Sequence, residues 1–234
     1  MLRILSLFVL VTALTLAACG RQVTFPNPSS SPGGVPAGFM QIKYRTANTM
    51  DFQNVRYFVV FNTSGNGIEP YPNGFQSGYA NYSFAFMVGG SGGTVSQPVL
   101  WQYIRNVATG QITAVAVPYT TQQVQLVPNS DGNNREFTLL FARNVFSNAF
   151  GPSSAPMPTA TPVNIWAINF ITTAADYTPL DALGPNGLQA NNYLLRLDVS
   201  TAFDEVQRLT VPAGAPQAAT PNAQLFGGEI INNP

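Results

Sequence analysis

The chain lacks most of the side chains on which enzyme active sites depend. Its 234 residues include no histidine, one cysteine and one lysine. Without histidine there is no Ser-His-Asp or Cys-His nucleophilic site, no His-ligated zinc and no His-held haem. The lysine, Lys43, falls within a predicted strand, which argues against Ser-Lys and Schiff-base chemistry. We therefore predict no cofactor, and carboxylates are the catalytic groups that remain.

Charge and long hydrophobic runs are also scarce. Ten basic and ten acidic residues balance, so the chain lacks the electrostatic footprint of nucleic-acid binding, and no nucleic-acid partner is expected. Charged residues make up 9% of the chain, so solubility depends on Asn, Gln, Ser and Thr. After residue 16, no stretch reaches the roughly 20 apolar residues that span a bilayer.

The N-terminus has the pattern of an export signal. Arg3 precedes an apolar run from Ile4 to Leu16, and the small pair Ala17-Ala18 follows. A basic start, an apolar run too short to span a membrane and small residues before a cleavage point are typical of a secretory signal. We predict a signal peptide over residues 1–18.

The lone cysteine comes directly after this signal. Leu16-Ala17-Ala18-Cys19 resembles the lipobox of bacterial lipoprotein precursors. The resemblance implies that Cys19 carries a diacylglyceryl thioether, and Gly20 in place of Asp implies no inner-membrane retention. Lipidation also accounts for an unpaired thiol in an exported chain, although a secretory signal with a chance cysteine is the alternative. We expect a lipid-anchored protein of the bacterial cell envelope, at the outer membrane or cell surface.

Proline, glycine and serine mark the organisation of the remainder. Residues 19–38 contain FPNPSSSPGGVPAG and are expected to form a tether. The domain is expected to span residues 39–234, with a Pro-rich loop at 151–162 and a Pro/Ala-rich tract at 212–221. Its strand-like runs lie between residue 39 and about 211.

Runs of β-branched and aromatic residues, bounded mostly by Gly, Pro, Asn or Asp, predict strands joined by turns. The expected strands are Phe39–Arg45, Val55–Phe61, Tyr82–Val88, Val99–Ile104, Ile112–Val117, Gln122–Val127, Glu136–Ala142, Val163–Thr172 and Tyr193–Val199. Helical signals are confined to a turn at Pro179–Leu183 and a short helix from Thr201. We predict an all-β fold, a single β-sandwich of immunoglobulin-like or jelly-roll-like type, with a closed barrel as the alternative.

Alternation along one run indicates how that strand is buried. Phe84, Phe86 and Val88 are expected to face the core, while Ser83 and Ala85 face the other side of the sheet. In a sandwich, one face of a strand buries and the other stays wet.

A polar loop at residues 129–136, NSDGNNRE, contains an Asp-Gly pair and predicts a hairpin turn, with φ > 0 at Gly132. The same loop offers oxygen ligands for calcium, but it begins with Asn and has no Glu at the twelfth position of an EF-hand. Residues 176–181 are a second candidate for calcium binding. No metal ligand is assigned, and calcium binding at either loop stays open.

The acidic residues provide the alternative function, a carboxylate-dependent glycan hydrolase. A glycosidase needs two carboxylates on either side of the scissile bond. No spacing singles out such a pair. Asp176 and Asp181 lie close enough in AADYTPLDALG to converge, yet both also suit turns. We therefore expect a protein that is not an enzyme.

Aromatic residues suggest a binding surface. Tyr71 and Tyr79 lie in a Gly- and Asn-rich loop, and Trp101 and Tyr103 follow a Gly-rich one. Flat rings with a polar edge suit sugars and protein interfaces. We predict ligand-binding rings among these four residues. In the alternative, Trp101 and Trp166 fill the core.

The order of YFVVFNTSGNGIEPYPNG followed by NYSFAFMV is similar to the strand and turn layout of exported β-sandwich binding modules, such as the carbohydrate-binding and DOMON-like families. The similarity covers a small part of the chain and transfers no site residue. The missing histidines and the scarce, scattered acids favour a non-enzymatic binding or structural role, with a glycan, a small ligand or an envelope protein as partner.

Lipidation of Cys19 is directly testable. Several acyl chains, each contributing about 0.8 kcal/mol per buried CH₂, would hold the chain on a membrane. Cys19→Ser should abolish palmitate labelling and release the protein from membranes, as followed by metabolic labelling and fractionation. An unlabelled wild-type chain in the soluble fraction would contradict the prediction.

Overall fold

The structure is a computed structural model that describes residues 32–65, 67–91, 94–106, 108–148, 164–184, 187–188, 195–206, 211 and 217–234. Cys19, the predicted signal peptide and the Pro-rich loop at 151–162 lie outside these ranges. Within them the fold is all-β and contains no α-helix. The described part also has no helix with the length and apolar character needed to cross a membrane.

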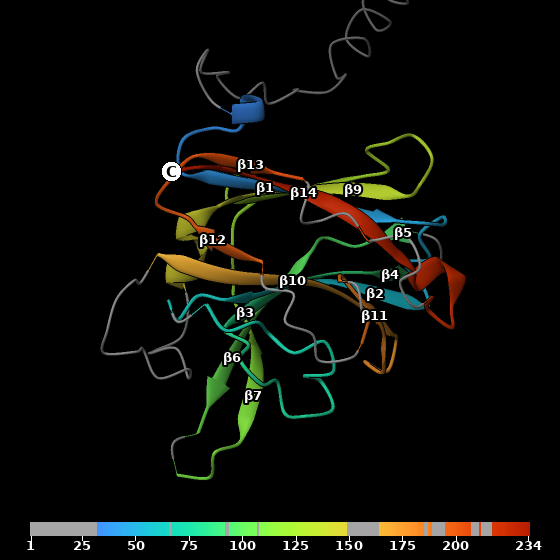
Figure 1. Ribbon diagram of the computed structural model, residues 1–234, viewed down its shortest axis with the longest axis horizontal. Coiled ribbons are helices and arrows are strands. Elements are labelled where there is room, and N and C mark those ends of the chain that lie inside the picture. Colours follow the sequence, from blue (N-terminus) through green and yellow to red (C-terminus); the bar gives the residue numbers. More distant parts are fainter. Residues whose placement is uncertain are drawn as a thin grey trace, which may run out of the picture.

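Two antiparallel sheets form two layers (Figure 1). The first sheet has the strand order β13-β14-β1-β9-β8, and the second has the order β11-β10-β2-β3-β6-β7, with β12 paired to β10. The first sheet consists of β1 (Phe39–Thr46), β8 (Val124–Pro128), β9 (Glu136–Ala142), β13 (Phe203–Glu205) and β14 (Leu225–Asn233). The second consists of β2 (Val55–Asn62), β3 (Phe84–Val88), β6 (Val99–Arg105), β7 (Ile112–Ala116), β10 (Ile165–Ala174), β11 (Pro179–Ala182) and β12 (Arg196–Asp198). A small hairpin, β4 (Gly90–Ser91) and β5 (Thr94–Val95), and the 3-10 turns η1 (Pro32–Gly34), η2 (Arg143–Asn148) and η4 (Pro221–Ala223) complete the described elements.

The prediction of an all-β, sandwich-like fold is confirmed, and a strand lies within or overlaps each predicted run. The helix predicted from Thr201 is wrong, because residues 203–205 form β13 and pair with β14. The turn predicted at 179–183 is likewise a strand, β11, which pairs with β10. The sequence pattern also missed β14, which pairs with β1 along the whole length of both strands.

The core between the sheets is centred on Tyr44 of β1. Its ring is stacked on Phe137 of β9 and Phe170 of β10, with centroids 5.0 and 4.9 Å away and interplanar angles of 12°. The Tyr44 hydroxyl donates to the carbonyl of Ile171 on the second sheet at 3.0 Å. Gly228 of β14 leaves room for this arrangement, since a Cβ there would clash with the Phe170 ring. A fully buried tyrosine thus joins the two sheets through packing and a hydrogen bond.

Asp181 provides a second link between the sheets. Its two carboxylate oxygens accept the backbone N–H groups of Leu225 on β14 at 2.8 Å and Ala182 at 2.9 Å. Burial raises the pKa of Asp181 to about 6, although these donors oppose the shift. Asp176, by contrast, is exposed and accepts the N–H of Thr178 at 3.0 Å within a turn. The two acids that the sequence placed close together therefore serve different structural purposes.

The central strands of the second sheet, β2, β3 and β10, are buried on both faces. Phe84, Phe86 and Val88 face the core between the sheets, as predicted. Ser83 and Ala85 are buried too, and Ala85 belongs to an apolar cluster on the outer face. The expectation that this face stays wet is wrong, because the loop at 63–83 covers it (Figure 1).

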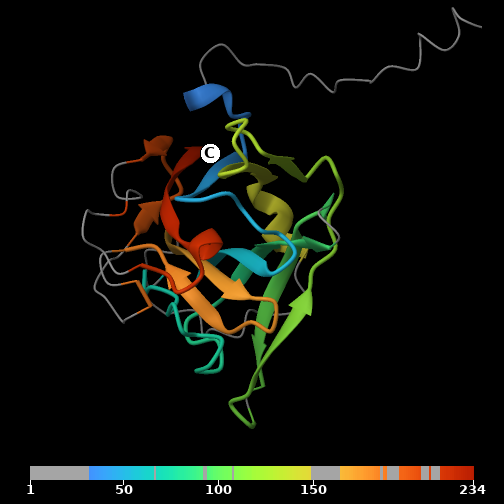
Figure 2. The same cartoon turned by 90° about the vertical axis from the view of Figure 1, so that its right-hand side faces the viewer.

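The N-terminal side of the described chain lies against the other sheet. The backbone at Gly33 packs on Ile231 of β14, and the buried Val35 accepts a hydrogen bond from the Asn233 amide at 2.8 Å. Packing therefore begins a few residues before Phe39, inside the predicted tether. Figures 1 and 2 show η1 above the first sheet, on the side opposite the loop at 63–83.

Candidate functional site

A second apolar cluster covers the outer face of the second sheet. Its side chains come from β2, β3, β6, β7, β10 and β11, from the loop at 63–83 and from residue 188. The buried members are Phe58, Val60, Tyr82, Ala85, Tyr103, Ile171 and Ala182, and the partly buried ones are Phe75, Tyr79, Met87, Trp101, Ile112, Ala114 and Leu188.

Aromatic rings form a connected layer at this surface. We define the aromatic layer as Phe58, Phe75, Tyr79, Tyr82, Tyr103 and Tyr177. Tyr103 contacts Tyr79 and Tyr82 with centroids 4.7 and 5.1 Å away. Phe75 contacts Phe58 at 4.8 Å and stacks on Tyr177 at 6.3 Å with an interplanar angle of 19°. Ring pairs at such distances stabilise each other beyond their buried area, so the layer is mutually supported.

Burial decreases from the sheet outward through the aromatic layer. Tyr82 and Tyr103 are buried, and burial raises the pKa of both hydroxyls well above the ordinary value for tyrosine. Tyr79 is partly buried, whereas 43% of Tyr177 is exposed. Tyr71, in the loop at 63–83 with Tyr79, is 42% exposed. The inner rings thus support outer rings that solvent reaches.

Two residues of the aromatic layer have an unusual backbone conformation. Tyr79 has φ 62° and Tyr177 has φ 67°, in the left-handed region that bulky residues rarely adopt. Such conformations cost about 1 to 3 kcal/mol each and cluster at functional sites. Both strained residues lie in the same layer, where ring packing offsets the cost.

Side chains of the second sheet fix the covering loop from beneath. The Asn62 amide donates to the carbonyl of Ile68 at 2.8 Å, and the Asn169 amide donates to the carbonyl of Pro70 at 3.2 Å. From within the loop, the Tyr82 hydroxyl donates to the carbonyl of Tyr71 at 2.8 Å. These bonds connect the loop to the sheet and to Tyr82, while the Tyr71 side chain stays exposed.

The same loop turns a carboxyl of its own inward, that of Glu69. Glu69 is only 7% exposed, and its Oε1 accepts a hydrogen bond from the Asn169 amide at 2.8 Å. Burial raises the pKa of Glu69 to about 8, because the charged form loses its hydration. The carboxyl is therefore mostly neutral at pH 7, and the loop packs over an uncharged group.

The residues that the sequence singled out differ in exposure and position in the structure. Tyr71 is exposed, and Tyr79 and Trp101 are partly buried at the outer cluster. Tyr103 is only 1% exposed, so it supports the layer and cannot itself stack on a ligand. Trp166 packs against the core between the sheets, which agrees with the alternative interpretation for that residue.

Sequence reasoning missed two residues of this surface. Tyr177 lies between Asp176 and Asp181 in AADYTPLDALG, a loop in which the acidic residues, not the aromatic ring, suggested a site. Glu69 was one of ten scattered acids, and no local pattern distinguishes a carboxyl that a loop will bury. The usable signal was Asn169, a polar residue inside the apolar run IWAINFITT, which needs a partner when buried.

The polar loop at 129–136 forms the predicted hairpin, with φ 72° at Gly132. Asp131 Oδ1 accepts the N–H groups of Asn133 and Arg135 at 3.1 and 3.3 Å, and the Ser130 hydroxyl donates to Glu136 at 2.8 Å. The side-chain oxygens considered for calcium thus serve the turn itself. Across the described ranges, no three His, Cys, Asp or Glu side chains group as metal ligands.

Two carboxylates do meet, on the outer face of the first sheet. Burial and the neighbouring Glu229 raise the pKa of Asp204, and the two side chains share a hydrogen bond. Glu229 also pairs with Lys43. Glycosidase carboxyls stand about 5 to 9.5 Å apart so that the sugar and water fit between them. The direct contact of Asp204 with Glu229 does not provide that space.

Comparison with known proteins adds no family to this description. The chain matches no family model, no curated protein and no solved structure.

Ionisation of Glu69 should weaken the fold. Its pKa is about 8 when folded and about 4.3 when unfolded, so the folded state holds the proton more tightly. Stability then falls as pH rises between these values. Asp181, with a folded pKa of about 6, acts in the same direction at lower pH. Between pH 6 and 8, the free energy of unfolding should fall by roughly 2 kcal/mol because of Glu69.

Urea denaturation at several pH values measures this dependence. Glu69→Gln should keep a polar group beneath the loop and make stability nearly constant from pH 6 to 8. Asp176→Asn is the matched control, since Asp176 is exposed and backbone and side-chain hydrogen bonds from Thr178 lower its pKa. Equal slopes for wild type and Glu69→Gln would show that Glu69 is not the titrating group.

Proposed function

We propose that this protein is a lipid-anchored component of the bacterial cell envelope that binds a neutral glycan through the aromatic layer, without catalysis. The observation that carries the proposal is the pair of outer rings of the layer, Tyr79 and Tyr177, on a support of buried rings, with the exposed Tyr71 beside them in the covering loop. Rigid aromatic side chains supply large contact areas at little cost in conformational entropy.

The chemistry of the covering loop favours an uncharged ligand. Residues 70–104 contain no Asp, Glu, Lys or Arg. Asn73, Gln76 and Ser77 are exposed beside the rings and offer hydrogen-bond donors and acceptors. Sugars present apolar C–H faces to rings and hydroxyl groups to such side chains. A neutral sugar fits this surface better than a charged ligand does.

The position of the aromatic layer suits a protein held at its N-terminus. Residues 33–35 pack on the first sheet, whereas the layer lies outside the second. If Cys19 is lipidated, the chain before Pro32 spans at most about 45 Å, from roughly 3.5 Å per residue. A tether of this length would let the aromatic layer face away from the membrane, toward glycans of the envelope or its surroundings.

A glycan array probed with the purified mature chain tests the proposal. We expect binding to neutral glycans, and Tyr71→Ala and Tyr177→Ala should each weaken it at least about tenfold, as for aromatic hot spots. Their melting temperatures should fall less than that of Tyr103→Ala, because both rings are partly exposed. Val127→Ala is the control, since it removes an exposed hydrophobic side chain outside the layer. Tyr103→Ala should instead cost about 3 to 5 kcal/mol of stability.

Two outcomes would contradict the proposal. One is an array without a bound glycan. The other is a bound glycan whose affinity is unchanged by Tyr71→Ala and Tyr177→Ala.

A further inference from the structure

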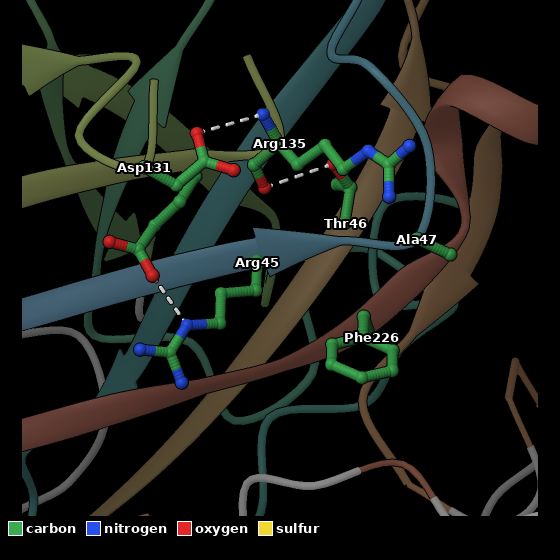
Figure 3. A pocket seen from close by; sticks show the side chains of 7 residues that line it. Arg45, Thr46, Ala47, Asp131, Arg135 and Phe226 are labelled. Atoms are coloured by element: carbon green, nitrogen blue, oxygen red, sulfur yellow. Dashed lines mark hydrogen bonds and ion pairs between the residues drawn. The ribbon is translucent and has the colours of Figure 1, made fainter. Parts of the chain in front are cut away.

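A pocket of about 300 Å³ opens on the first sheet, away from the aromatic layer (Figure 3). Three segments that are distant in sequence line it: the end of β1, the β8–β9 hairpin and the start of β14. The lining residues are Arg45, Thr46, Ala47, Asp131, Arg135, Glu136 and Phe226.

A β-bulge turns the Phe226 ring outward at this pocket. Arg45 pairs with Gly227 and Thr46 pairs with Leu225, so Phe226 is the extra residue on β14. Bulges redirect side chains and are over-represented next to functional sites. Phe226 is 57% exposed, the most of the large hydrophobic residues in the described part. The strand irregularity thus presents an aromatic face to the pocket.

The carboxylates of the pocket already have partners. Glu136 accepts from Arg45 through Oε2 and from the Ser130 hydroxyl through Oε1 at 2.8 Å. Asp131 accepts two backbone N–H groups of its own turn, and these hydrogen bonds lower the pKa of Asp131. Figure 3 shows the Asp131 carboxylate directed at the backbone N–H of Arg135, while the Arg135 guanidinium extends away from it. Both carboxylates therefore already make hydrogen bonds or ion pairs at the hairpin.

Arg135 differs from Arg45 in this respect. Its carbonyl accepts the N–H and the hydroxyl of Thr46 at 2.9 and 3.2 Å, which fixes its backbone at the pocket. Its exposed guanidinium extends toward Ala47 (Figure 3) and makes no hydrogen bond or ion pair with any residue that the structure describes. A positioned cation with unused donors thus lines the same pocket as an exposed ring.

We propose that this pocket binds an acidic sugar, with its carboxylate on Arg135 and a face of its ring on Phe226. A guanidinium presents parallel N–H donors that match the two oxygens of a carboxylate. The apolar face of a pyranose suits the flat ring of Phe226. A neutral sugar would leave the Arg135 donors unused. The site is independent of the aromatic layer, so either can fail without the other.

Titration of the purified mature chain with D-glucuronate, followed by NMR or calorimetry, tests this site. For a single small ligand we expect a dissociation constant near the millimolar range, about −4 kcal/mol. Arg135→Gln should weaken binding at least about tenfold, and Arg135→Lys should have an intermediate effect, because it keeps the charge but loses the paired donors. Phe226→Ala should weaken binding several-fold. Arg105→Gln removes a matched exposed arginine outside the pocket and should leave the affinity unchanged.

Three results would overturn the proposal. They are no saturable binding of D-glucuronate, equal affinity of Arg135→Gln and wild type, and equal affinity for D-glucose and D-glucuronate. The melting temperature of each variant is measured alongside. If Arg135→Gln fails to fold, Arg135→Lys and Phe226→Ala carry the same test, and unchanged affinity in both contradicts the site.

Discussion

Burial of the central strands of the second sheet on both faces is the constraint on which the rest of the structure depends. The core between the sheets covers one face, and Tyr44 locks that core by stacking on both layers and bonding across them. The other face carries Phe58 and Tyr103, which need a cover of their own. The loop at 63–83 supplies that cover with aromatic side chains, and the outermost rings of this second packing layer are the candidate binding surface.

The stability of the loop at 63–83 and its outer rings depends on opposing contributions. The strained backbone at Tyr79 and Tyr177 lowers the stability of the folded loop, and the buried carboxyl of Glu69 lowers it too. Ring contacts and the hydrogen bonds from Asn62 and Asn169 offset these costs. A preorganised surface loses little conformational entropy on binding, so a protein with few charges can still bind through shape and apolar contact.

Local sequence predicted the elements but not the long-range partners that define the surface. The runs that became β1, β2 and β9 were recognisable because β-branched and aromatic residues lie between turn residues, and Asp-Gly marked the β8–β9 hairpin. β14 was missed because Gly227 and Gly228 interrupt its pattern, and the need for Gly228 comes from Phe170 on the other sheet. The burial of Tyr103 was equally invisible, since it depends on a loop that covers its strand from a distance.

Aromatic side-chain NMR of the chain with and without a saturating neutral glycan tests the central claim most directly. Ring C–H resonances report which aromatic residues a ligand contacts. The account predicts shifts at Tyr71, Tyr79 and Tyr177, with the resonances of Tyr44 and Tyr57 in the core unchanged. Saturated binding that leaves Tyr71, Tyr79 and Tyr177 unshifted would contradict the assignment of the aromatic layer as the binding site.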